Sequence, residues 1–238
     1  MAKKTAKPQG KEAATPAKPR RKRLSPEERR AQIVAAARSL FAAEGTDNVS
    51  MRKIAKRVGI TQAAIYQHFE NKEAIFFVII EGFFSDLLAA LEAASAKETE
   101  PLHRLRSAMR AYIEYGLSRP EEYRLVFMTP MSGLVRAGLA VPRTDEARQT
   151  PSKGSLAFDV LDRAVRDVAL AGRTRFANTD LLAEAVWAAG HGIVSLLITH
   201  DQFPWADRAA IVDFQLDLVF RGLLHDNCPM RKQIAGLS

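Results

Sequence analysis

The chain has 238 residues, a formal net charge of +8 at pH 7 and 47% hydrophobic residues, which is enough apolar material for a packed core. It contains no run of about 18 apolar residues, because the nearest candidate, Ile75 to Leu91, is interrupted by Glu81 and Asp86. We therefore expect no membrane-spanning helix and no membrane partner. A single cysteine, Cys228, excludes an internal disulfide framework and favours a cytoplasmic location.

The positive charge is concentrated at the N-terminus. Residues 1–23 contain nine Lys or Arg and one acid, whereas the remainder holds 26 basic and 26 acidic residues. Three prolines and almost no apolar residues beyond alanine predict a disordered basic arm over 1–23. Such an arm attracts polyanions such as nucleic acid, or serves only to keep the protein in solution.

From Leu24 onward apolar residues recur at helical spacing and no alternating strand appears, which predicts an all-α protein. Ser25, Pro26 and Glu28 match a capping box with a proline in the first helical position. They predict a first helix that ends at Gly45 in the left-handed conformation. Its apolar stripe consists of Ile33, Ala36, Ala37, Leu40 and Phe41.

Two short helices follow, and their spacing matches a DNA-reading motif. Ser50 is placed to cap a helix over 51–58, and Thr61 to cap one over 62–69, with a glycine-containing turn at 59–61 between them. Two helices joined by such a turn form a helix-turn-helix. If Ile65 and Phe69 face inward, a step of about 100° per residue places on the outward face Ala63, Tyr66 and Gln67, with Gln62 at the helix start.

The outward side chains suit the major groove of DNA. A glutamine pairs with adenine through two hydrogen bonds, and an alanine methyl contacts the thymine methyl. Ser50, Tyr66, His68 and Lys72, together with helix N-terminal amides, are placed to hold phosphates. The alternative interpretations are a surface tyrosine at Tyr66, a helix-packing role for His68 and a three-helix unit that binds no DNA.

The run Ala63 to Phe69, followed by Asn71-Lys72-Glu73, resembles the signature of the TetR family of transcriptional regulators. Residues 41–45 and 50–55 agree with that family in order and spacing, although Met51 stands where threonine or valine is commoner. The resemblance covers about residues 27 to 80 and implies a homodimer, a palindromic operator in double-stranded DNA and a small-molecule effector. With the outward side chains, the expected DNA-binding set is Ser50, Arg52, Thr61, Gln62, Ala63, Tyr66, Gln67, His68 and Lys72.

Further helices complete the predicted architecture. Asn71 is placed to cap a long helix that carries Ile75 to Leu87, and Gly and Pro residues predict a loop over 129–154. The other helices are expected at 103–118, 121–128, 155–171, 181–199 and 206–224. We expect a DNA-binding domain over 24–72 with its motif at 50–69, an effector-binding and dimerisation domain over 73–228, and a flexible tail over 229–238.

A second resemblance lies at Val186 to Ile193, which is similar to the C-terminal domain type named after its Trp, His and Gly. It implies that the last two helices pack against a second subunit. The expected dimer interface is Trp187, Gly190, Ile193, Leu197, Ile211, Phe214 and Leu218. The expected effector pocket, whose members are equally compatible with plain core packing, is Phe83, Tyr112, Tyr115, Phe127, Phe158 and His191.

Three classes of function compete for this sequence. The leading hypothesis is a repressor that a small molecule releases from DNA. The second is an architectural, nucleoid-associated protein in which the basic arm dominates binding. An enzyme is disfavoured, because we find no Gly-rich phosphate loop, nucleophile elbow or zinc motif. His103, His200 and His225 lack metal-ligand spacing, so we expect no metal and no cofactor.

Overall fold

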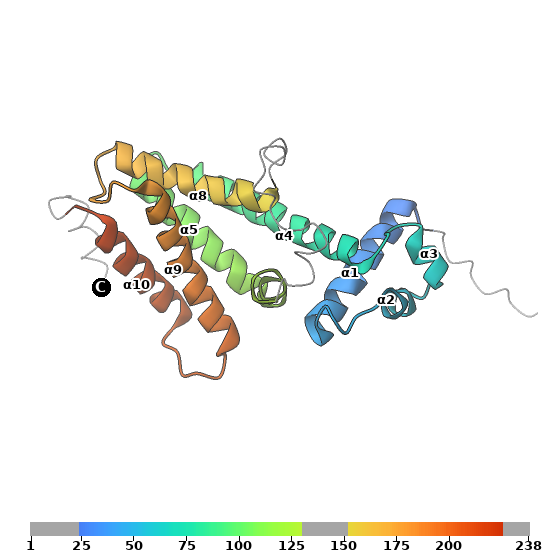
Figure 1. Ribbon diagram of the computed structural model, residues 1–238. Helices are drawn as coiled ribbons and strands as arrows, with labels where there is room; N and C mark the ends of the chain where they lie inside the picture. The colour runs from blue at the N-terminus through green and yellow to red at the C-terminus, as the bar shows by residue number, and fades with distance from the viewer. Residues whose placement is uncertain (1–23, 130–151, 226–238) are drawn as a thin grey trace, which may run out of the picture.

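The computed structural model describes residues 24–129 and 152–225, and these residues are helical apart from short connections. Within these two ranges the only strand-like pairing is a single bridge between Thr174 and Leu224. Figure 1 shows two groups of helices, with one long helix running from the first group into the second. The predicted all-α class is confirmed. The expected basic arm and C-terminal tail lie outside the described residues, as does most of the expected loop over 129–154.

The first group consists of α1 (Pro26–Glu44), α2 (Met51–Val58), α3 (Gln62–Tyr66) and the start of α4 (Lys72–Ser95). The predicted capping box is present, because the Ser25 hydroxyl accepts from the Glu28 N–H and the Glu28 carboxylate accepts from the Ser25 N–H. The core of this group contains Ile33, Ala37, Phe41, Val49, Met51, Ile54, Ala55, Ile65, Phe69, Ile75, Phe76, Ile79 and Leu125.

Two local expectations in this group need correction. Gly45 has a positive φ of 78°, but its ψ of 155° is not that of a left-handed helical residue, so the chain leaves α1 in an extended direction. The recognition helix α3 ends at Tyr66 instead of reaching Phe69, because the N–H groups of His68 and Phe69 both bond the Ile65 carbonyl in a closing turn. Phe69 nevertheless lies in the core.

The second group contains the rest of α4 and six further elements. These are α5 (Pro101–Ser118), α6 (Pro120–Tyr123), the π-helix η1 (Arg124–Met128), α8 (Lys153–Leu170), α9 (Thr179–Thr199) and α10 (Arg208–Leu223). The helix expected from Ser155 begins earlier, at Lys153, because the Ser152 hydroxyl caps it by accepting from the Ser155 N–H at 3.1 Å. Lys153 and Gly154 are therefore helical and do not belong to the expected loop.

Helices α4 and α9 are long and apolar enough to cross a membrane by length and composition alone. The α4 helix contains the stretch Ile75 to Leu91 that the sequence analysis considered and set aside, whereas α9 was not considered there. Both also supply core residues to the second group, Phe83 and Leu87 from α4 and Val186 and Val194 from α9. A core helix of a helical domain has the same composition, so this property is weak evidence for a membrane.

Two elements connect the groups. The first two turns of α4 pack in the first core, which therefore extends past the expected boundary at Lys72. The segment formed by α6 and η1 contributes Leu125 to the first core and Tyr123 to the second. An ion pair of 2.6 Å between Arg38 of α1 and Glu122 of α6 joins the same two parts. A movement of α6 and η1 would therefore change the packing of both groups.

Candidate nucleic-acid interface

The turn between α2 and α3 depends on a glycine. Gly59 has φ 77° and ψ 35°, the left-handed helical conformation that glycine adopts without a steric penalty. Its N–H bonds the carbonyl of Lys56, and the N–H of Ile60 bonds that of Ala55, which together form a Schellman motif. This ending turns the chain sharply, so that α3 starts at once and the Thr61 hydroxyl caps it by accepting from the Ala64 N–H.

The recognition helix α3 is held from behind by apolar packing and by one arginine. Ile65 is fully buried and Phe69 is 3% exposed. The Arg30 guanidinium lies 4.0 Å above the centroid of the Phe69 ring, and it donates to the His68 carbonyl at 2.6 Å. These contacts fix the end of a helix that is too short to be stable alone.

The opposite side of α3 faces solvent, as predicted. Gln62, Ala63, Tyr66 and Gln67 are exposed, and Tyr66 keeps 49% of its surface accessible. His68 is only partly exposed, since its backbone is drawn towards α1. The face thus offers two amides, a methyl and a phenol, which are the group types that contact base edges and phosphates.

Next to this face lies an open hollow of about 650 Å³. It brings together five of the nine residues that the sequence predicts for DNA binding, Ser50, Arg52, Gln62, Tyr66 and Lys72. The other four, Thr61, Ala63, Gln67 and His68, lie outside its lining. Residues from α2, α3 and the start of α4 therefore form one continuous surface, with acidic Asp47 and Glu73 also on its wall.

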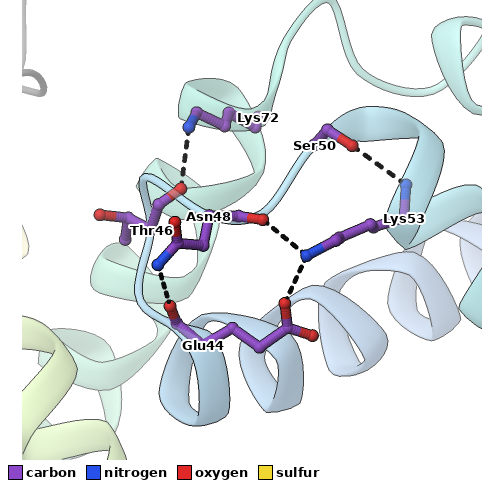
Figure 2. A network of polar contacts seen from close by, with 6 residues as sticks. All are labelled: Glu44, Thr46, Asn48, Ser50, Lys53 and Lys72. Atoms are coloured by element: carbon purple, nitrogen blue, oxygen red, sulfur yellow. Dashed lines mark hydrogen bonds and ion pairs between the residues drawn. The ribbon is translucent and has the colours of Figure 1, made fainter.

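Two lysines brace the loop between α1 and α2 beside this hollow (Figure 2). The Lys53 ammonium lies 2.6 Å from the Glu44 carboxylate and donates to the Asn48 carbonyl at 2.9 Å. Lys72 donates to the Thr46 carbonyl at 2.8 Å, so the ammonium expected to hold a phosphate is also a structural tie. The sequence reading missed Lys53, because its partners in the preceding loop are set by the turn and not by helical spacing.

The outer surface of α2 is basic. Arg52, Lys53, Lys56 and Arg57 are all exposed, and this eight-residue helix contains no acidic residue. In a helix-turn-helix the first helix crosses the DNA backbone, where positive charge is required. The sequence reading had named only Arg52 among these four.

A second candidate site lies in the helices that follow, where the six residues expected to line an effector pocket converge. The Phe83 ring centroid lies 5.0 Å from that of Tyr115 and 5.9 Å from that of Phe127. Phe127 lies 5.2 Å from His191 by the same measure, and Phe158 joins them through Trp187. The sequence reading placed these residues in one pocket, but it did not include Tyr123, which stacks on His191 at 5.5 Å.

Hydrogen bonds run through this aromatic cluster. The Trp187 indole N–H donates to the Tyr112 hydroxyl at 3.2 Å, and the Tyr112 and Tyr123 hydroxyls lie 2.8 Å apart. The Tyr123 hydroxyl is 2.6 Å from Nδ1 of His191, whose Nε2 is 3.2 Å from the Ser195 hydroxyl. No sequence spacing predicts this chain, because its members come from α5, α6 and α9.

Burial keeps the titratable members of the cluster neutral. Desolvation is the main cause that raises the pKa of Tyr112 and of Tyr123 above the ordinary value, and it lowers the pKa of His191. Burial also raises the pKa of Tyr115 to about 12, and the Tyr115 hydroxyl donates to the Phe83 carbonyl. The site therefore presents uncharged polar groups at neutral pH.

The expected dimer interface divides into two sets. Gly190, Ile193 and Leu197 are buried within the subunit, which corrects their assignment to a subunit contact. Gly190 faces α5, where an added Cβ would lie 2.4 Å from the Met109 methyl group. Of the seven residues expected in the interface, Trp187, Phe214 and Leu218 are exposed, and Ile211 is partly exposed.

Comparisons with known proteins agree with this geometry. Residues 33–79 match the family "Bacterial regulatory proteins, tetR family", and residues 105–219 match "Tetracyclin repressor-like, C-terminal domain". A crystal structure of a tetR-family regulatory protein from Rhodococcus RHA1 superposes with a TM-score of 0.64 at 22% identity, covering 84% of this chain and 99% of that one. The narrower Trp-His-Gly domain type stays a prediction.

The chain spans about half the length of two curated relatives that it matches. The HTH-type transcriptional activator FasR of Mycolicibacterium smegmatis is 30% identical over 105 residues, which is 44% of this chain and 48% of FasR. The nucleoid occlusion factor SlmA of Vibrio cholerae is 30% identical over 99 residues, 41% of this chain and 50% of SlmA. None of these proteins is named as an enzyme. The two matched models lie in tandem along the chain, which thus belongs to the tetR family of bacterial regulatory proteins.

Proposed function

We propose that this regulator is a cytoplasmic homodimer that represses transcription from a palindromic operator and leaves it when a small molecule binds its C-terminal helices. The observation that carries the proposal is the outward face of α3, where Gln62 and Tyr66 are exposed while Ile65 and Phe69 anchor the helix from behind. A rigid helix with free amide and phenol groups is what major-groove reading requires.

The side chains divide into two roles in this proposal. Gln62, Ala63 and Gln67 contact base edges, because they occupy the outward side of α3. The remaining residues, which lie around the helix ends and on α2, hold phosphates or steady the docked helix: Ser50, Arg52, Thr61, Tyr66, His68 and Lys72. Lys53, Lys56 and Arg57 add positive charge on the same side. Each phosphate that they neutralise releases counterions, so binding should weaken with salt.

The dimer is proposed to form through the exposed side of α9 and α10. Phe214 and Leu218 are 60% and 54% exposed and lie one turn apart on α10. Leu196 of α9, 48% exposed, and Gly192, which has open space around it, lie on the neighbouring helix. Pairing these faces would bury apolar surface and set the two α3 helices about 34–36 Å apart, as successive major grooves demand.

The release mechanism uses the connection between the two cores. An effector that displaces Tyr123 or Phe127 moves α6 and η1, which also carry Leu125 and Glu122. Both of these residues contact the first group, Leu125 through its core and Glu122 through Arg38. Release then follows if the effector binds more tightly to a conformation in which the spacing of the α3 helices no longer fits DNA.

Selection of random duplex DNA by the purified full-length protein tests the DNA-binding part. We expect an enriched inverted repeat, and we expect Gln62→Ala to lose about 1–3 kcal/mol of binding free energy for it. Gln32→Ala is the matched control, because Gln32 is an exposed glutamine of α1 and is not part of the helix-turn-helix. Enrichment of no sequence, or equal losses in both variants, would contradict base reading by α3.

Size measurement tests the dimer. Phe214→Glu or Leu218→Glu should convert the dimer to a monomer in sedimentation, because a charge would face the apolar partner surface. Leu170→Glu is the control, since Leu170 is 87% exposed on α8. In vitro transcription from a promoter that overlaps the selected operator then distinguishes repression from activation, which is the activity named for FasR.

A second candidate function is that of a nucleoid-associated protein, favoured by the similarity to nucleoid occlusion factors and by the basic segment 1–23. Genome-wide mapping separates the two. A few palindromic peaks support the regulator of a small set of promoters, whereas broad coverage supports the alternative. Removal of residues 1–23 should leave the operator preference intact in the first case and abolish most binding in the second.

A further inference from the structure

A run of five aromatic side chains in the second group of helices is partly exposed. Phe84, Phe127, Phe158 and His191 are half-buried, and Trp187 is 37% exposed. They form a continuous run, with centroid distances of 5.7 Å from Phe84 to Phe127, 6.5 Å from Phe127 to Trp187 and 5.9 Å from Trp187 to Phe158. All three of these contacts are tilted or edge-to-face, so none of the three pairs is stacked, and the exposed part of Trp187 is the surface that another flat molecule can meet.

Hydrogen bonds connect the polar groups behind these rings. The Trp187 indole N–H can only donate, so the Tyr112 hydroxyl accepts from it. The Tyr112 hydroxyl also lies 2.8 Å from the Tyr123 hydroxyl and 3.4 Å from Nδ1 of His191, whose Nε2 lies 3.2 Å from the Ser195 hydroxyl. Trp187 is the most exposed member and its N–H is the one fixed donor, so it is the group that we assign to an incoming oxygen.

The cluster is also free of charge among the described residues. Burial is the cause of the lowered pKa of His191, and burial and neighbouring neutral groups account for the shift at Tyr112. Two arginines near the cluster are engaged elsewhere, because Arg119 lies over the Tyr115 ring and Arg124 bonds the Ile198 carbonyl. A carboxylate or phosphate that entered would lose its water without gaining a cation.

The π-helix η1 places Phe127 in this run. π-Helical turns are rare and are frequent at functional sites. The Phe127 ring contacts Phe84, Trp187 and His191, so it is the central ring of the run.

From these observations, and building on the proposed effector response, we infer that the effector is an uncharged aromatic molecule carrying a hydroxyl or carbonyl oxygen. Its ring inserts among Phe127, Trp187 and Phe158. Its oxygen accepts the Trp187 N–H, in place of the Tyr112 hydroxyl. An anionic ligand is bound more weakly because no charged group among the described residues shifts the pKa of Tyr112 or His191, and a flexible aliphatic chain is bound more weakly because it cannot stack on the rings.

Calorimetric titration of the full-length protein with four probes tests this inference: 2-naphthol, 2-naphthoate, 1-octanol and octanoate. We expect 2-naphthol to bind about tenfold or more tightly than the two anions, because a buried unpaired charge costs at least that factor. We expect it to bind about two- to tenfold more tightly than 1-octanol, because lost aromatic stacking costs about 0.5–1.5 kcal/mol. Trp187→Phe, which keeps a ring but removes the N–H, should weaken 2-naphthol several-fold. Trp205→Phe is the control, because the Trp205 N–H donates to the His200 carbonyl outside the cluster.

The outcomes separate the ligand class from the proposed function. Equal or tighter binding of 2-naphthoate, 1-octanol or octanoate overturns the inference, as does the absence of binding by all four. An unchanged affinity of Trp187→Phe for 2-naphthol overturns the role of the indole N–H. DNA binding is measured in parallel on unliganded protein, so its failure counts against the proposed function and not against the ligand class.

Discussion

The two helical cores place their polar groups in opposite ways. In the first core the buried side chains are apolar, and the polar side chains of α3 point outward. In the second, three tyrosines are buried and two of them join His191 in a hydrogen-bonded chain. An apolar base gives the first region a rigid surface that needs no rearrangement to meet DNA. The second holds polar groups whose pairing a ligand can replace, which suits a responsive site.

The largest expected effect on stability comes from removing a side chain that anchors α3 in the first core. Ile65→Ala removes a fully buried side chain and leaves a cavity, so we expect a loss of about 2–5 kcal/mol in the free energy of unfolding. Urea denaturation measures it, and Gln67→Ala, an exposed change on the same turn, should stay within about 0.5 kcal/mol. Comparable stabilities of the two variants would show that α3 is not anchored as described.

The next effect is expected at Gly116 of α5, where the second region is closely packed. A Cβ at Gly116 would lie 2.8 Å from Val194 and 2.9 Å from the Tyr123 ring, so Gly116→Ala should cost about 1–3 kcal/mol and displace Tyr123. Gly82→Ala is the matched control on α4, where nothing lies within 4 Å, and it should stabilise by up to about 1 kcal/mol. A stabilising Gly116→Ala would mean that the second core is loosely packed.

A smaller effect is expected at the start of α1. Ser25→Ala removes the side-chain half of the capping box, so we expect a loss of about 1 kcal/mol in unfolding free energy. Ser39→Ala, an exposed change inside the same helix, should be close to neutral. If both variants have the stability of the wild type, the capping box contributes nothing, and packing alone determines where α1 begins.

The smallest effect is a dependence of stability on pH that we expect from His191 of the second region. Burial lowers the pKa of His191 from its ordinary value of 6.5. The stability supplied by the neutral ring is therefore complete above about pH 6.5, and it declines as the pH falls towards the lower folded-state pKa. His191→Gln keeps a hydrogen-bonding side chain that does not titrate, so its melting temperature should fall less than that of the wild type on acidification. Parallel pH profiles would contradict a buried neutral His191.

The helices of the first region could be predicted from the sequence because their caps depend on neighbouring residues. Ser25, Ser50, Thr61 and Asn71 each cap the helix that follows them, as predicted, because a cap involves only neighbours within three residues. The boundary of α3 was wrong by three residues, since the contact between Arg30 and the His68 carbonyl spans 38 positions and helps to hold the closing turn. The family resemblance at 63–69 predicted DNA binding because this short motif contains both the buried anchors and the outward side chains of α3.

The sequence by itself determined the helical class, the capped starts of α1 to α4 and the outward side chains of the recognition helix, since each depends on periodicity or on adjacent residues. Only the tertiary structure decided that Gly190, Ile193 and Leu197 face inward, and that Tyr112, Tyr123 and His191 share hydrogen bonds. A helix with apolar residues on more than one side does not reveal which side meets its own core. Packing against α5 settles that choice, because it joins positions about 80 residues apart.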